Sequence, residues 1–182
     1  MTDYPDTDLI ENLRYNIHHC GALLPKEKSI IAEGYLWGAA TSPLTACLPS
    51  QAQPTGFDLL ILADLLFNHS EHEKLLSTVQ STLKKTRDVQ ALVFFTPYRP
   101  WLLEKDLAFF DLAKQGGFEV EKIFEKVMEK VMFEEDPGVS KGYLSNATFF
   151  AADRHANTVM QDELLRRTVF GYSLHWSEAM LR

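Results

Sequence analysis

Two short, mostly apolar runs, Phe57–Ala63 (FDLLILA) and Val89–Phe95 (VQALVFF), are each followed by a segment with helical spacing. Runs of this length and composition are typical of strands that are buried on both faces of a parallel sheet. The segments that follow them, Asn68–Lys85 and Trp101–Lys114, carry apolar residues on one side of a helix. The order strand, helix, strand, helix predicts an α/β fold whose crossovers bring the strands parallel.

The pattern continues on both sides of this unit. Phe118–Lys130 and Arg167–Trp176 are predicted as a third and a fourth strand, the former only imperfectly alternating. Towards the N-terminus, Asp6–Cys20 has helical spacing and Ser29–Trp37 is a short β-like run, followed by a loop at 38–55. The prediction is one domain over residues 1–182, because domains usually span about 100–200 residues.

Charge and apolar content exclude several classes of partner. The net charge of −7 argues against a nucleic-acid partner, which usually requires a basic face. The longest apolar runs are far shorter than the roughly 20 residues of a membrane-spanning helix, so no membrane association is expected. The two cysteines, Cys20 and Cys47, do not form a disulfide framework, which favours a reducing compartment. We therefore expect a soluble protein of the cytoplasm.

Asp64 is the first candidate for a functional side chain. In open α/β sheets, ligands bind at the carboxyl ends of the strands, and Asp64 directly follows the strand Phe57–Ala63. The alternative is that Asp64 caps the next helix, a position that Asp favours. Spacing alone favours the cap.

Five blocks give the chain a wider resemblance. They are DYPD at 3–6, GYLWG at 34–38, ADLLFNH at 63–69, PWLLEKD at 100–106 and MFEED at 132–136. In this order they resemble the fungal elongation factor methyltransferases once assigned as nicotinamide N-methyltransferases. The resemblance implies a seven-strand class I methyltransferase sandwich of the Rossmann-like type, with strand order 3-2-1-4-5-7-6 and S-adenosyl-L-methionine as cofactor.

The resemblance also implies roles for individual residues. Asp3 matches the carboxylate that holds the cofactor ribose, Trp37 the aromatic beside the adenine, and Ala63 a small strand-end residue next to the cofactor. Asp64 and Phe67 match the two ends of an Asp-x-x-Tyr motif and are the catalytic candidates. Phe67 stands where the motif has Tyr, so a role that needs the hydroxyl proton is in doubt. Without the resemblance, Trp37 could equally be a core residue.

The histidines do not predict a metal site. His18 and His19 are adjacent on a helix and point about 100° apart, so they cannot easily share a metal. His69 and His72 are spaced i, i+3 and could share one, although solvated or capping roles are more common. We expect no metal.

The implied reaction is methyl transfer to an amine. The resemblance implies elongation factor 1-alpha as the protein partner, with its N-terminal glycine and the adjacent lysine as acceptors. An α-amine, with a pKa near 7.7–8.0, is far easier to deprotonate than a lysine near 10.4. Two alternatives stay open: a small-molecule methyltransferase acting on nicotinamide, and a non-catalytic interaction fragment.

Two departures from the family pattern are expected to matter. The acidic residue and Gly-x-Gly loop of class I methyltransferases do not precede Asp3, so the sandwich is expected to lack its first strands, with an exposed apolar edge at 57–63. As a truncated chain it is expected to bind cofactor poorly and to be inactive. The segment at 139–161 interrupts the family pattern and is interpreted as an insertion or a retained intron, the rival being a genuine loop.

Overall fold

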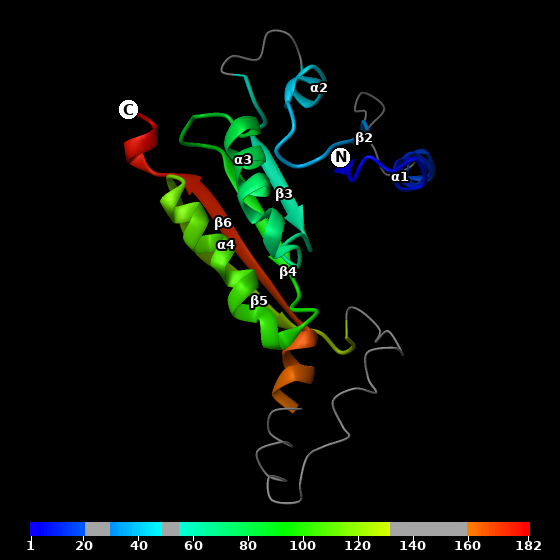
Figure 1. Cartoon of the computed structure of the whole chain (residues 1–182), viewed down its shortest axis with the longest axis vertical. Helices are drawn as coiled ribbons and strands as arrows, with labels where there is room; N and C mark the ends of the chain where they lie inside the picture. The colour runs from blue at the N-terminus through cyan, green and yellow to red at the C-terminus, as the bar shows by residue number, and fades with distance from the viewer. Residues whose placement is uncertain (21–29, 49–54, 132–159) are drawn as a thin grey trace, which may run out of the picture.

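The computed structural model of the chain describes residues 1–20, 30–48, 55–131 and 160–182. Its main body is a four-stranded sheet with two long helices (Figure 1). In order across the sheet, the strands are β3 (Leu59–Ala63), β4 (Gln90–Phe95), β6 (Thr168–Trp176) and β5 (Phe118–Val127). The predicted α/β class is therefore confirmed.

The sheet is mixed rather than wholly parallel. β3 and β4 pair in parallel, as predicted, and the pairing runs from Leu59 opposite Gln90 to Ala63 opposite Phe94. β6 then lies between β4 and β5 and is antiparallel to both. The third predicted strand thus does not pair with the second, because the fourth lies between them. This order is compatible with the 4-5-7-6 end of the order that the resemblance implies.

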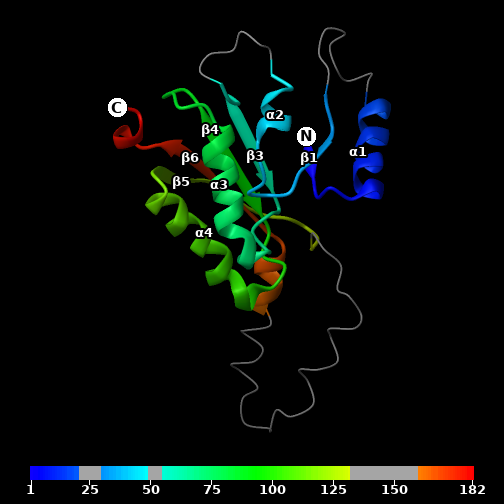
Figure 2. The ribbon, with the colours of Figure 1, turned by 45° about the horizontal axis from the view of Figure 1, so that its top comes forward.

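Two helices cover one face of this sheet in both views (Figures 1 and 2). The crossover from β3 to β4 contains the 3-10 turn η2 (His69–Glu71) and α3 (His72–Thr82). The next crossover contains η3 (Pro100–Leu102) and α4 (Leu103–Gln115). Gly117 follows α4 with φ +93°, a backbone conformation that glycine adopts without a Cβ penalty, and α4 ends at Gln115, one residue after the predicted end at Lys114.

The core fills the space between the sheet and these helices. It contains side chains from alternate positions of the strands and from the inner sides of α3 and α4. Its most buried members are Leu66, Val79, Ala91, Val93, Phe109, Ala113 and Leu174.

The opposite face of the sheet is not covered by any helix in the described part of the chain. Leu59 and Ile61 of β3 are 46% and 65% exposed, and Phe124 of β5 is 40% exposed. The prediction that Phe57–Ala63 is buried on both faces is therefore wrong for one face. The predicted apolar edge is confirmed, since β3 is the outermost strand of the four-stranded sheet.

The N-terminal part lies beyond the β3 edge in both views (Figures 1 and 2). It contains β1 (Thr2–Asp3), α1 (Thr7–His19), β2 (Glu33–Gly34) and the short helix α2 (Ser42–Thr45). Asp6 caps α1, because its carboxylate accepts hydrogen bonds from the backbone N–H groups of Asp8 and Leu9. The run at 29–37 keeps only two residues as strand, which pair in parallel with β1, and α2 lies in the predicted loop.

Two further expectations concern the rest of the chain. Among the residues that the structure describes, no helix has both the length and the apolar composition of a membrane span. The segment interpreted as an insertion, 139–161, lies outside the described residues except for its last two, which belong to a helical segment over 160–166.

Candidate functional site

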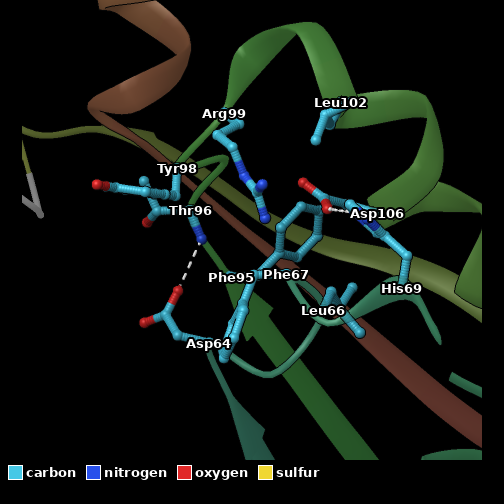
Figure 3. A pocket seen from close by; sticks show the side chains of 10 residues that line it. All are labelled: Asp64, Leu66, Phe67, His69, Phe95, Thr96, Tyr98, Arg99, Leu102 and Asp106. Carbon is cyan, nitrogen blue, oxygen red and sulfur yellow. Dashed lines mark hydrogen bonds and ion pairs between the residues drawn. The ribbon is translucent and has the colours of Figure 1, made fainter. Parts of the chain in front are cut away.

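A pocket of about 600 Å³ lies at the carboxyl ends of β3 and β4, where the predicted fold places ligands (Figure 3). Three segments form it: the loop after β3, the end of β4 with the loop that follows, and the beginning of α4. Its lining consists of Asp64, Leu66, Phe67, His69, Phe95, Thr96, Tyr98, Arg99, Leu102 and Asp106. Both residues predicted to be catalytic, Asp64 and Phe67, are among them.

Asp64 connects the ends of the two strands. Its backbone N–H donates to the carbonyl of Phe94 at 2.8 Å, and its Oδ1 accepts from the backbone N–H of Thr96 at 2.9 Å. Its φ of +52° lies in the left-handed region, which Asp tolerates better than most residues. Burial raises the pKa of Asp64, and the Thr96 hydrogen bond partly opposes that shift. The helix-cap alternative is wrong, because this carboxylate bonds to the neighbouring strand.

Phe67 presents its ring to the pocket and to solvent. The residue is 56% exposed and is part of the pocket lining. An exposed ring at a pocket mouth can contact an apolar or cationic group of a ligand. It has no proton to give, so Phe67 can act only through its aromatic face.

A histidine and an aspartate meet at the other end of the group of side chains in Figure 3. His69 Nε2 lies 2.6 Å from Asp106 Oδ1, and the two side chains are 23% and 8% exposed. Burial raises the pKa of Asp106, while the hydrogen bond from His69 lowers it and the positive charge of Arg99 lowers it further. A carboxylate this buried is retained in proteins when it is paired, and His69 is the partner.

His72 packs against the His69 ring of this pair. It is buried, its Nε2–H donates to the carbonyl of Leu66 at 2.8 Å, and its ring meets those of His69 and Phe109 edge to face. Burial lowers the pKa of His72, with the Leu66 hydrogen bond opposing the shift. His69 and His72 thus have separate partners. No cluster of three metal-ligating side chains occurs among the described residues.

The residues expected to hold the cofactor do not line this pocket. Asp3 ends β1, where its Oδ1 accepts the N–H of Tyr4 at 2.7 Å. Trp37 follows β2 and is partly buried against the core, and Ala63 is the exposed last residue of β3. Their chemistry fits a nucleoside: a carboxylate oxygen of Asp3 with no partner among the described residues for a hydroxyl, an indole face for a purine, and a small side chain that leaves room.

Sequence reasoning did not identify Asp106 or the partnership of His69. Asp106 belongs to the block at 100–106, which signalled the resemblance but gave no role to its last residue. The resemblance implies that Asn68 and His69 face the substrate mouth, with a solvated or capping role as the alternative for His69, but it gave His69 no partner. The two are 37 positions apart in the chain, and the only signal for their meeting was that both begin helices after neighbouring strands.

An α/β domain with a pocket at the carboxyl ends of its strands is compatible with a methyltransferase fold. No family model matches the chain. The chain is 48% identical over 181 residues, 100% of its length, to Protein N-terminal and lysine N-methyltransferase efm7 of Aspergillus fumigatus, of which it covers 60%. For the protein of the same name in Emericella nidulans the identity is 45% over 182 residues, covering 99% of the chain and 61% of that relative.

A third relative matches over a shorter stretch of the chain. Protein N-terminal and lysine N-methyltransferase EFM7 of Eremothecium gossypii is 49% identical over 140 residues, 75% of the chain and 51% of that protein. The chain is a homologue of these fungal methyltransferases, so the resemblance drawn from the five sequence blocks is confirmed. It spans about three fifths of the length of the first two relatives.

Proposed function

We propose that the protein is an S-adenosyl-L-methionine-dependent N-methyltransferase of the cytoplasm that acts on elongation factor 1-alpha. Its acceptors in this proposal are the N-terminal glycine and the adjacent lysine. The observation that carries the proposal is the pocket after β3 and β4, which combines the partly buried carboxylate of Asp64 and the buried carboxylate of Asp106 with the exposed ring of Phe67. Carboxylates and an aromatic face together suit an amine, which arrives as a cation.

The cofactor is proposed to lie beside this pocket rather than in it. Asp3 would hold the ribose hydroxyls, Trp37 the adenine, and Ala63 would leave space at the end of β3. S-Adenosyl-L-methionine supplies an activated methyl group on a sulfonium. The protein contributes proximity and alignment, which are worth about 7–11 kcal/mol in well-oriented reactions.

The names of the relatives favour a protein acceptor. The curated relatives are called protein N-terminal and lysine N-methyltransferases, and none of the names reported above mentions a small-molecule acceptor. Phe67 in the pocket lining is 56% exposed, so this part of the pocket wall faces solvent, from which a protein acceptor would approach. We therefore place the acceptor amine near Asp64 and Phe67, the two predicted catalytic residues.

The test is a methyl-transfer assay with radiolabelled S-adenosyl-L-methionine. The enzyme is the natural protein, purified from the cells that produce it. Elongation factor 1-alpha is expected to be labelled at its N-terminal glycine and next lysine, as located by mass spectrometry of its first peptide. Nicotinamide, tested in parallel, is expected to remain unlabelled. Label on nicotinamide alone, or on neither acceptor, would overturn the proposal. The 182 residues on their own are assayed beside it, and efficient transfer by them would contradict their expected inactivity.

A further inference from the structure

The pairing of His69 with Asp106 has no role in the assignments above. We propose that His69 is the catalytic proton acceptor for the substrate amine and that Asp106 is the positioning residue that orients its ring. This inference rests on the proposed N-methyltransferase function, and it assigns the step that such a reaction needs before the methyl group can move. It stands on the geometry of the pair and its place in the pocket wall.

The geometry fixes which ring nitrogen is available. Nε2 lies 2.6 Å from Asp106 Oδ1, so it carries the proton and donates it to the carboxylate. Nδ1 is then the nitrogen with the lone pair, and it has no hydrogen-bond partner within the described parts of the chain. His69 lines the pocket and 23% of its side chain is exposed. The proposal takes Nδ1, the nitrogen not bonded to Asp106, as the atom that meets the substrate. A histidine held by a buried carboxylate in one tautomer is the usual arrangement of a general base.

The charges around His69 suit an imidazole that gains a proton during the reaction. Asp106, from α4, would stabilise the imidazolium. His72, from α3, is held neutral by its burial and adds no competing positive charge while it donates to the Leu66 carbonyl. Arg99, from the loop after β4, lies near Asp106 and opposes the imidazolium, and Asp64 lines the same pocket with a second carboxylate. Two acids and one arginine leave the pocket net negative.

The proposed step balances as follows. The substrate arrives as an ammonium ion, and one N–H bond breaks as its proton moves to His69 Nδ1. The freed lone pair on nitrogen attacks the methyl carbon, and the carbon–sulfur bond breaks with its electrons remaining on sulfur. The products are a methylated ammonium, the neutral thioether and an imidazolium, which then releases its proton to solvent. An imidazole suits this role because its charge changes between pH 5 and 8.

The decisive measurement is kcat/KM against pH for two peptides that present different amines. One has a free N-terminal glycine and arginine in place of lysine; the other is N-terminally acetylated and keeps the lysine. Without a base, only the amine that is already neutral reacts. His69→Gln is therefore expected to reduce kcat/KM at pH 7 by about tenfold for the α-amine and on the order of a thousandfold for the lysine, following their ordinary pKa values. The loss should vanish as pH approaches the pKa of each amine.

Asp106→Asn is expected to give a smaller loss with the same dependence on pH and on the amine. Asp111→Asn, an exposed aspartate on the same helix, is the matched control and should behave as wild type, as should His18→Gln on α1. Thermal unfolding of each variant shows that the fold is retained. A loss that is equal at every pH and for both amines, or no loss at all, would overturn the role of His69 and leave the methyltransferase standing. No transfer at any pH by the wild-type protein purified from its own cells would overturn both.

A second readout does not depend on turnover. In the wild type, 15N NMR of the His69 ring at pH 8 should show the proton on Nε2 and a lone pair on Nδ1. The Asp106→Leu variant should lose this single tautomer, because the oxygen that fixes it is gone. A wild-type ring protonated on Nδ1 would overturn the inference whatever the kinetics show.

Discussion

Asp64 both closes the strand pair and faces the pocket, so its substitution has a structural and a chemical consequence. Asp64→Ala leaves the Thr96 N–H without its acceptor and places alanine at φ +52°. An unpaired buried donor costs about 1–3 kcal/mol, so we expect the free energy of unfolding to fall by that amount in urea titrations. The Thr96 hydroxyl is also buried and has no hydrogen-bond partner in the described part of the chain.

Asp64→Asn separates the two consequences. Asparagine keeps an acceptor oxygen and tolerates the left-handed region, so stability should stay within about 0.5 kcal/mol of wild type. If the carboxylate charge binds the substrate cation, methyl transfer should nevertheless fall in this variant. A stability loss as large as that of Asp64→Ala would contradict the hydrogen bond as described.

His72 gives a prediction for stability against pH. Burial lowers the pKa of His72, so the unfolded chain takes up this proton near pH 6.5 and the folded chain only at lower pH. Between those two values the unfolded state binds more protons, and stability falls as the pH falls, by at most about 1.4 kcal/mol per pH unit. Denaturant unfolding at a series of pH values from 7.5 to 4.5 measures this slope.

The carboxyl groups change stability with pH in the opposite direction to His72, so their contribution must be separated from that of the histidine. Burial raises the pKa values of Asp64 and Asp106, so on acidification the folded state takes up their protons first and gains relative stability. His72→Gln keeps an N–H that can reach the Leu66 carbonyl but does not titrate. Subtracting the unfolding free energy of His72→Gln from that of the wild type at each pH should therefore leave only the contribution of His72. If the two proteins show the same dependence of stability on pH, His72 is not a buried neutral histidine.

Of the individual site residues, some could be identified from the sequence and others could not. Asp64 was found because a carboxylate after a buried strand has a defined place in the fold, and Phe67 followed from the same block. Asp106 could not be found, because its partner lies on a different crossover and no local pattern records the pairing. The hydrogen bond from the Thr96 N–H to the Asp64 carboxylate forms with Asp64 at a positive φ. The sequence does not specify that backbone conformation.

Among the secondary-structure elements, β3 has two different faces. Leu62 is 4% exposed and packs in the core, whereas its neighbour Ile61 is 65% exposed. Leu62→Ala is expected to lower the free energy of unfolding by about 2–5 kcal/mol, through lost transfer energy and a cavity. Ile61→Thr is expected to change it by less than about 0.5 kcal/mol, as exposed substitutions usually do.

Chemical denaturation of Leu62→Ala and Ile61→Thr side by side checks these two predicted changes in the free energy of unfolding. A large loss in Ile61→Thr would mean that the face of β3 away from the helices is covered in solution. The same substitution should reduce aggregation at high concentration, measured by light scattering, because it removes an apolar side chain from an edge strand.

The elements themselves were largely predictable, and their pairing was less so. The helices α3 and α4 followed from the apolar spacing of Asn68–Lys85 and Trp101–Lys114. The apolar composition of Phe57–Ala63 does not show whether one face of the strand is buried or both. Burial of each face depends on which other elements pack against it. The place of β6 between β4 and β5 is a long-range choice, and the residues of β6 read equally well as an outer strand.

For the molecule as a whole, the segment at 139–161 gives a prediction about the transcript. If it is a retained intron, sequencing the messenger RNA across Gly138–Asp162 should give reads that join these two residues directly. Reads that retain the segment in translated transcripts would establish it as a genuine loop. Mass spectrometry of the purified protein distinguishes the same two outcomes, and peptides from within 139–161 would contradict the intron.

The whole-molecule class was the most predictable feature. Alternating strands and helices fixed the α/β class, and five ordered blocks indicated the family of methyltransferases that the relatives confirm. The acceptor, the number of methyl groups and the cofactor contacts depend on groups outside the chain, so no property of the residues alone determines them.

The position of β6 has a consequence for how the protein is made. β5 leaves the ribosome well before β6, yet its only neighbour in the described sheet is β6. Until that strand emerges, β5 has no ladder partner and the pair β3–β4 has an open side, so nascent chains expose two unpaired strand edges at once. Synthesis at about 5–20 residues per second makes this interval last seconds. We therefore expect ribosome-associated chaperones to bind the nascent chain between the translation of β5 and the translation of β6.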